Sequence, residues 1–202
     1  MLRSVNTFEQ SFVENIGSFD LDLPAETVTR LGEYYSLLTR WNDRLHLVAP
    51  CTPEEFAVRH VLESLMLLNH LLHGARVVDV GSGGGLPIIP CLIARPDLQA
   101  TLIESSQKKA VFLREATRSF QVTIIARPFE QVDPPPSVDF VTCRALDQFM
   151  QKLPALLEWA GESTLLLFGG ERLGEELRKA NVNFESFLIP RSEKRYLFLA
   201  TD

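Results

Sequence analysis

The chain has 202 residues, 46% of them hydrophobic, which is enough to bury a large core in one domain or in one domain with an appendage. It lacks the ~18 consecutive apolar residues of a membrane span and, near its start, the apolar core of a signal peptide, so we expect a cytoplasmic protein with no membrane partner. The net charge of −6 argues against broad nucleic-acid binding, and any surface for a polyanion must therefore be local.

The distribution of charges and cysteines narrows these expectations. Residues 1–74 contain five Lys/Arg and ten Asp/Glu, whereas residues 75–202 contain fifteen and sixteen, so a polyanion surface is expected mainly in the second part. Three widely spaced cysteines suit buried thiols in a reducing compartment better than disulfides. His70 and His73 could share a helix face, but no second pair of ligands lies nearby in the sequence, and we expect no metal site.

Residues 1–74 are predicted to form helices that cap a sheet domain. Phe8 and Phe12 recur at helical spacing. Residues 52–55 begin a later helix, because a capping threonine and a proline are followed by two acids near the positive end of the helix dipole. Gly74 is expected to end this helix. Its apolar face is expected to contain Val58, Val61, Leu62, Leu65, Leu68, Leu71 and Leu72.

From residue 75 onward, β and α segments alternate, which predicts a doubly wound parallel sheet. The last two strands are joined by a short polar connection and could pair antiparallel. The chain is thus expected to be an α/β protein with a seven-stranded, mostly parallel, Rossmann-like sheet at 75–202 and a helical cap at 1–74, together forming one compact unit. Strands are expected at residues 77–80, 100–103, 122–126, 138–143, 163–168, 184–189 and 196–200.

The most informative stretch is residues 76–104. A short β-branched strand is followed by four glycines within residues 81–85, then by a helix that Pro96 must end, and then by a second strand that delivers Glu104. In open α/β sheets, ligands lie outside the carboxyl ends of the strands. The glycine turn and Glu104 are therefore candidates for one cofactor site, and the plainer alternative is a glycine turn without a ligand.

The glycine pattern discriminates between two cofactors. A dinucleotide requires Gly-x-Gly-x-x-Gly, but Leu86 occupies the third glycine position, and Asp79 would repel a pyrophosphate. S-adenosylmethionine (SAM) carries an ammonium and a sulfonium and no phosphate, and its ribose hydroxyls could donate to Glu104. The pattern Asp-x-Gly-x-Gly-x-Gly at residues 79–85 resembles the first motif of class I SAM-dependent methyltransferases.

Further motifs resemble a single family, the GidB/RsmG methyltransferases of small-subunit (16S) ribosomal RNA. The glycine motif is typical of the whole superfamily, whereas the cap motifs and the Gly-Leu-Pro-x-Ile-Pro turn are specific to the family. The matching residues follow one another along nearly the whole chain: Trp41-Asn42, Leu45-His46-Leu47, Arg59-His60-Val61-Leu62-Glu63-Ser64, Asp79 through Pro87, Ile89-Pro90, Arg95-Pro96, Lys108-Lys109, Phe112-Leu113-Arg114, Arg127 and Arg144-Ala145.

The resemblance implies a class I fold and methyl transfer from SAM to N7 of one guanine in the 16S rRNA of the small ribosomal subunit. No catalytic base is expected, since guanine N7 has an unprotonated lone pair and positioning suffices; Arg144 is the one candidate catalytic side chain. The motif supplies Asp79 and Gly83 as cofactor contacts, and the resemblance adds Gly81, Leu86, Glu104, Ser105, Ser106, Pro128, Phe129 and Arg144. RNA contacts are expected from Lys108, Lys109, Arg114 and Arg127, with Arg191, Lys194 and Arg195 as a further candidate patch.

Plainer roles compete with these assignments. Phe129 could be ordinary core, the charges of the helix at 105–120 could form a solvated face, and each arginine could make a surface salt bridge. Relatives usually carry a glycine at Ile88 and a lysine at Gly169. Three alternatives therefore stay open: a SAM-dependent methyltransferase with another RNA or a small molecule as acceptor, a SAM-binding protein without transfer activity, and, last, a nicotinamide oxidoreductase. The protein is expected to be a monomer.

Overall fold

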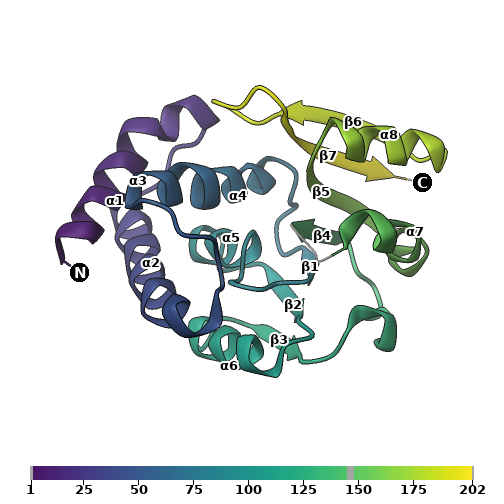
Figure 1. The fold of residues 1–202 in the computed structure, drawn as a ribbon, viewed down its shortest axis with the longest axis horizontal. Helices are drawn as coiled ribbons and strands as arrows, with labels where there is room; N and C mark the ends of the chain where they lie inside the picture. The colour runs from purple at the N-terminus through teal and green to yellow at the C-terminus, as the bar shows by residue number, and fades with distance from the viewer. Residues whose placement is uncertain (1, 145–147, 202) are drawn as a thin grey trace.

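The structure is a computed structural model that describes residues 2–144 and 148–201 (Figure 1), so Ala145 of the family motif lies outside it. Within these residues, seven strands form one sheet in the order β3-β2-β1-β4-β5-β7-β6. The strands are β1 (Arg76–Val80), β2 (Gln99–Ile103), β3 (Val122–Ile125), β4 (Phe140–Arg144), β5 (Thr164–Gly170), β6 (Asn183–Leu188) and β7 (Arg195–Thr201).

The sheet is parallel except at one edge, as the sequence predicts. Strands β1 to β5 pair in parallel, and β7 runs antiparallel between β5 and β6. Burial explains why β7 takes the inner place: Leu197, Phe198 and Ala200 are buried, whereas β6 has no fully buried residue. Since β7 is antiparallel, its first residue, Arg195, lies opposite Gly170 at the carboxyl end of β5.

Helices cover both faces of the sheet. Side chains alternate along a strand, so Val77 of β1 packs on one face and Val78 on the other. The Val77 face is covered by α5 (Ile88–Ala94), α6 (Gln107–Ala116) and the cap, and the Val78 face by α7 (Phe149–Ala160) and α8 (Glu171–Lys179).

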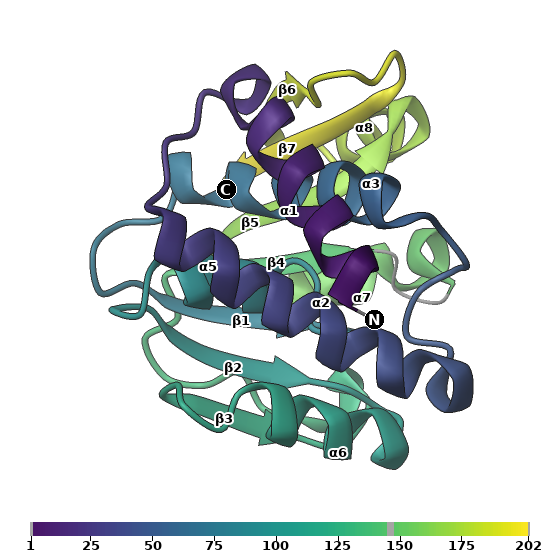
Figure 2. The same cartoon turned by 90° about the vertical axis from the view of Figure 1, so that its left-hand side faces the viewer.

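The cap consists of helices that share a core with the sheet. Figure 2 shows α1 and α2 in front of the sheet. Phe8 of α1 stacks on Tyr35 of α2 at 5.1 Å between ring centroids, and Trp41 meets Phe112 of α6 at 6.0 Å. The helical elements are α1 (Leu2–Asn15), η1 (Ile16–Phe19), α2 (Ala25–Leu45), α3 (Pro53–Glu55), the π-helix η2 (Phe56–Leu62), α4 (Glu63–Leu65) and η3 (Met66–Asn69).

The sequence predicted correctly where the helical run from α3 to η3 begins, but not where it ends. The Thr52 hydroxyl accepts from the Glu55 N–H, and the Glu55 carboxylate accepts from the Thr52 N–H, a complete capping box. The helix ends at Asn69 rather than near Gly74. The prediction that Leu72 belongs to the buried face is therefore wrong, because Leu72 lies beyond the helix and is 69% exposed.

Three further expectations are corrected by the structure. Cys51 is exposed, whereas Cys91 and Cys143 are buried as expected. Helix α6 ends at Ala116 rather than at residue 120. Gly169 and Gly170 belong to β5, because both pair with β7, instead of following the strand as a loop. No helix of the described part combines the length and the apolar character needed to cross a bilayer.

Candidate cofactor site

The predicted site elements meet along one edge of the sheet. Strands β3, β2, β1 and β4 are neighbours and parallel. Their carboxyl ends therefore lead side by side into the Pro128 turn, Glu104, the glycine loop at 81–85 and Arg144. We call this edge the rim.

Glu104 ties the glycine loop to the start of α6. Its carboxylate accepts from the Gly83 N–H at 2.8 Å and from the Ser106 N–H at 2.7 Å. The Gly81 N–H also donates to the Ile103 carbonyl at 2.9 Å. Glu104 is buried, and each of its oxygens keeps a second lone pair for a ligand hydroxyl. The sequence prediction that this acid and this loop belong to one site therefore has a direct geometric counterpart.

The cap holds the same loop from the other side. The Tyr34 hydroxyl of α2 donates to the Gly84 carbonyl at 2.6 Å, and burial raises the pKa of Tyr34, which keeps this donor protonated. A Cβ at Gly84 would lie 3.3 Å from Leu38 and 3.4 Å from Leu47, so the cap approaches the loop closely. The sequence placed Tyr34 only on an apolar helix face, and no local signal pointed to this contact.

Asp79 is the most unusual group of the site. Its side chain is 0% exposed, and neither carboxylate oxygen has a hydrogen-bond partner within the described residues. Its register partner on β4, Thr142, is also fully buried with an unpartnered hydroxyl. Burial raises the pKa of Asp79 to about 8; the nearby Ser82 hydroxyl, which donates to the Asp79 main-chain carbonyl, opposes this shift, and the Glu104 charge adds to it to a smaller extent. Since buried polar groups normally have partners, this unpartnered pair makes Asp79 a candidate for contact with a polar ligand.

Phe129 was expected to lie against an adenine, or else in the core. In the structure its ring is 3% exposed and packs edge-on against Trp159, with 6.1 Å between ring centroids. Contact of this ring with a ligand would require it to leave the core. The backbone of Pro128 and Phe129 is therefore the better candidate for contact at this position.

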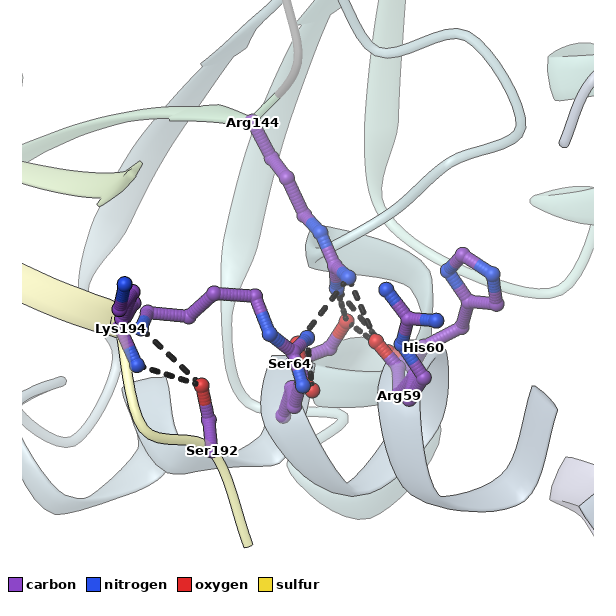
Figure 3. Close-up of polar contacts among 8 residues, drawn as sticks. Arg59, His60, Ser64, Arg144, Ser192 and Lys194 are labelled. Carbon is purple, nitrogen blue, oxygen red and sulfur yellow. Dashed lines mark hydrogen bonds and ion pairs between the residues drawn. The ribbon is translucent and has the colours of Figure 1, made fainter. Parts of the chain in front are cut away.

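The Arg144 side chain points to Arg59, His60 and Ser64 of the cap (Figure 3). Its guanidinium donates to the Arg59 carbonyl at 2.5 Å and to the His60 carbonyl at 3.3 Å. It also contacts Ser64 Oγ and the Glu63 carboxylate, each at 3.3 Å. The resemblance implied that Arg144 contacts the cofactor. No feature of the sequence around Arg144 predicted that it would also bind main-chain carbonyls of the cap.

The candidate RNA residues are spread over the rim and one adjoining helix. Arg127, just beyond β3, and Lys108 are exposed, and Lys109 is partly buried in the first turn of α6. Arg114 is exposed in the last turn of α6, about 9 Å further along the helix axis than Lys108. Serines 105 and 106 precede α6, and the Ser106 hydroxyl accepts from the Lys109 N–H at 3.4 Å.

Position 169, where the family resemblance implies lysine, is packed so closely against Leu173 that a side chain larger than that of glycine would clash. A Cβ at this position would lie 2.5 Å from Leu173 Cδ2 and 2.9 Å from Leu173 Cβ. We therefore expect Gly169→Lys to destabilise the protein by about 1–3 kcal/mol through overpacking, measured as the urea midpoint of unfolding. The variant Gly169→Lys/Leu173→Ala should relieve only the part of the clash made by Leu173 Cδ2, because alanine keeps the Cβ at 2.9 Å, and it loses Leu173 packing as well.

Gly17→Lys is the matched control for this prediction, because a Cβ at Gly17 would meet nothing within 4 Å. A Gly169→Lys variant as stable as Gly17→Lys would show that Leu173 moves aside freely and that the packing does not require glycine.

Histidine, cysteine and carboxylate side chains do not assemble into a metal site in the part of the chain that the structure describes: no group of three or more of them is placed to hold an ion.

Comparisons with known proteins agree with this architecture. The family model GidB, rRNA small subunit methyltransferase G, matches residues 27–200. Ribosomal RNA small subunit methyltransferase G of Sorangium cellulosum is 37% identical over 182 residues, 85% of this chain and 76% of that protein. The protein of the same name from Gluconobacter oxydans is 39% identical over 166 residues, 79% of this chain and 83% of its own.

Among solved structures, a SAM-dependent methyltransferase from Aquifex aeolicus has the same fold, with a TM-score of 0.59 and 13% identity over 83% of this chain and 98% of that one. The match of the family model to most of the chain, together with these relatives, decides the family. The chain belongs to the GidB, or rRNA small subunit methyltransferase G, family.

Proposed function

We propose that this protein transfers a methyl group from SAM to N7 of one guanine in the 16S rRNA of the small ribosomal subunit. The observation that carries the proposal is the unpartnered, buried Asp79 carboxylate beside a glycine loop that Glu104 holds in place. Membership of the family supplies the class of reaction and the kind of RNA.

The residues of the rim fit SAM better than a dinucleotide. Asp79 offers a buried carboxyl that ionises when an ammonium group binds beside it, and in its ionised form it would repel a pyrophosphate. Glu104 offers free lone pairs for two ribose hydroxyls. The backbone at Gly81, Gly83 and Leu86, the Ser105–Ser106 turn and the Pro128–Phe129 turn would complete the cofactor site.

The main role of the chain in this mechanism is to position the cofactor and the RNA base. SAM, when bound, supplies an activated methyl group on its sulfonium. Guanine N7 carries a free lone pair, so no residue has to remove a proton before transfer. The chain contributes an entropic effect: Glu104 and Tyr34 hold the glycine loop, and the cap limits where a base can enter. Arg144 acts in this proposal by holding the cap at the rim.

The RNA-facing residues would be the exposed cations at the rim. Arg127 and Lys108 can contact phosphates, and an arginine can also contact the O6/N7 edge of a guanine. Lys109 and Arg114 extend this charge along α6. We further propose that the protein works as a monomer in the cytoplasm, where its RNA substrate is made, and that residues 1–74 and 75–202 act as one unit.

A changed acceptor is the second candidate function, because Gly169 cannot accept the usual lysine without displacing Leu173. The deciding experiment is methyl transfer from labelled SAM to small ribosomal subunits from cells that lack this enzyme. Label recovered as 7-methylguanosine at a single 16S rRNA site would support the main proposal. Binding of SAM without transfer would indicate another acceptor or a binding protein.

The ionisation of Asp79 provides a test that does not require turnover. Binding of SAM at pH 7 should release about one proton, because a carboxyl with a pKa of about 8 is mostly protonated at that pH and a bound cation favours its ionised form. The affinity should accordingly increase as the pH rises from 6 towards 8. Calorimetry in two buffers that differ in ionisation enthalpy measures the released proton directly.

Asp79→Asn keeps the shape of the side chain and removes its charge. This variant should bind SAM more weakly and release no proton from this position. Equal proton release from the variant and the natural protein would contradict the assignment of Asp79 to the cofactor ammonium.

A further inference from the structure

Glu63 is a buried carboxylate that the proposed methyl transfer does not itself use. It lies in α4 of the cap and is 2% exposed. Arg144 at the end of β4 approaches it at 3.3 Å, and Arg195 at the start of β7 forms a closer ion pair with its other oxygen. A buried carboxylate is tolerated only when it is well paired, so these contacts have to persist.

The three residues come from parts of the chain that are remote from one another. Arg195 is 132 positions from Glu63 and reaches the rim because β7 runs antiparallel to β5. The Ser192 hydroxyl accepts from the Arg195 N–H at 3.0 Å, which holds the turn before β7. One carboxylate thus joins the cap to two strand ends on either side of β5.

The same cluster clamps an irregular part of the cap. Arg144 donates to the main-chain carbonyls of Arg59 and His60, which lie in the π-helix at 56–62. Such wide turns are rare and occur frequently at functional sites. The His60 imidazole stays neutral, because burial lowers its pKa to about 4, with contributions from the nearby guanidiniums, Arg144 foremost. Arg59, on the same turn, is exposed.

We propose that Glu63 is a positioning residue for methyl transfer to RNA: by holding Arg144 and Arg195 on one carboxylate, it fixes the π-helical turn that carries Arg59 and His60 at the rim. This inference rests on the proposed function. A role through charge alone predicts a different result from a positioning role. Removing the Glu63 anion from among three arginines would then only strengthen the attraction for RNA. Tighter RNA binding together with slower transfer is therefore the signature of positioning.

The test uses the full chain with Glu63→Gln. We expect unchanged SAM affinity, RNA binding that is equal or tighter, and a kcat lower by about tenfold to a hundredfold, the effect of a small misplacement at a reacting centre. The double variant Glu63→Gln/Arg195→Gln should lose no more than Glu63→Gln alone, since residues that act as a pair are not additive. Additive losses, or a kcat equal to that of the natural protein, would overturn the inference.

Asp139→Asn is the matched control. Asp139 pairs with Arg76 at 3.0 Å at the opposite, amino end of the strands, and its loss should leave kcat unchanged. If the natural protein binds SAM but transfers no methyl group, the proposed function fails. Amide hydrogen exchange then tests separately whether Glu63 fixes the π-helical turn. Faster exchange over residues 56–64 in Glu63→Gln, but not in Asp139→Asn, supports positioning, and unchanged exchange overturns it.

Discussion

Replacing Glu104 by alanine is expected to weaken SAM binding by at least about 100-fold. The carboxylate holds Gly83 and Ser106 and is the acceptor proposed for two ribose hydroxyls, and each of those two bonds to a charged acceptor is worth about 1.5–3 kcal/mol. Loss of the carboxylate frees the glycine loop and removes the acceptor proposed for the ribose. Since each 1.4 kcal/mol corresponds to about tenfold in affinity, even the lower figure for two bonds predicts this loss. Calorimetric titration with SAM measures it.

Glu115→Ala is a suitable control for Glu104→Ala. Glu115 also belongs to α6, and it pairs with Arg118 on the helix surface. It should bind SAM as the natural protein does, because exposed ion pairs contribute little. Tight SAM binding by Glu104→Ala would place the ribose elsewhere and remove the main argument for this site.

The second large effect is expected for Gly85→Ala, which should destabilise the protein by about 2–5 kcal/mol. Gly85 has φ +82, a left-handed conformation that costs alanine about 1–2 kcal/mol. In addition, a Cβ would lie 2.6 Å from Ile89 Cγ1, and Ile89 is fully buried in α5 and β-branched, so it cannot move aside cheaply. Thermal and urea unfolding measure the change.

Gly74→Ala separates the two causes. Gly74 also has a positive φ, +70, but a Cβ there would meet nothing within 4 Å. It should therefore cost only the backbone part, about 1–2 kcal/mol. Equal destabilisation by both alanine variants would show that the contact with Ile89 relaxes and that backbone conformation alone requires glycine at position 85.

Local features of the sequence predicted the framework of the site. The β-branched run before residue 81 and the acid after the second strand placed the glycine loop and Glu104 at one rim, where the Gly83 N–H donates to Glu104. This succeeded because parallel neighbouring strands must end on the same side of a sheet. Lengths of helices were less well predicted, as at Leu72, because a helix end depends on packing as much as on local residues.

The side-chain partners at the rim were beyond such reasoning. In the structure Arg144 holds the cap through main-chain carbonyls, and Phe129 is buried against Trp159. Tyr34 is 50 positions from the Gly84 carbonyl that it binds. No periodicity or motif encodes which of several arginines reaches a given carboxylate.

The sequence by itself therefore determined the family, the alternation of strands and helices, and the chemistry available at the glycine loop, because these depend on spacing, backbone conformation and the order of motifs. Only the tertiary structure decided that the cap grips this loop through Tyr34, and that Glu63 gathers Arg144 and Arg195. Such contacts join elements far apart in the chain, and they form only where packing brings the elements together and burial makes an unpaired charge or dipole too costly.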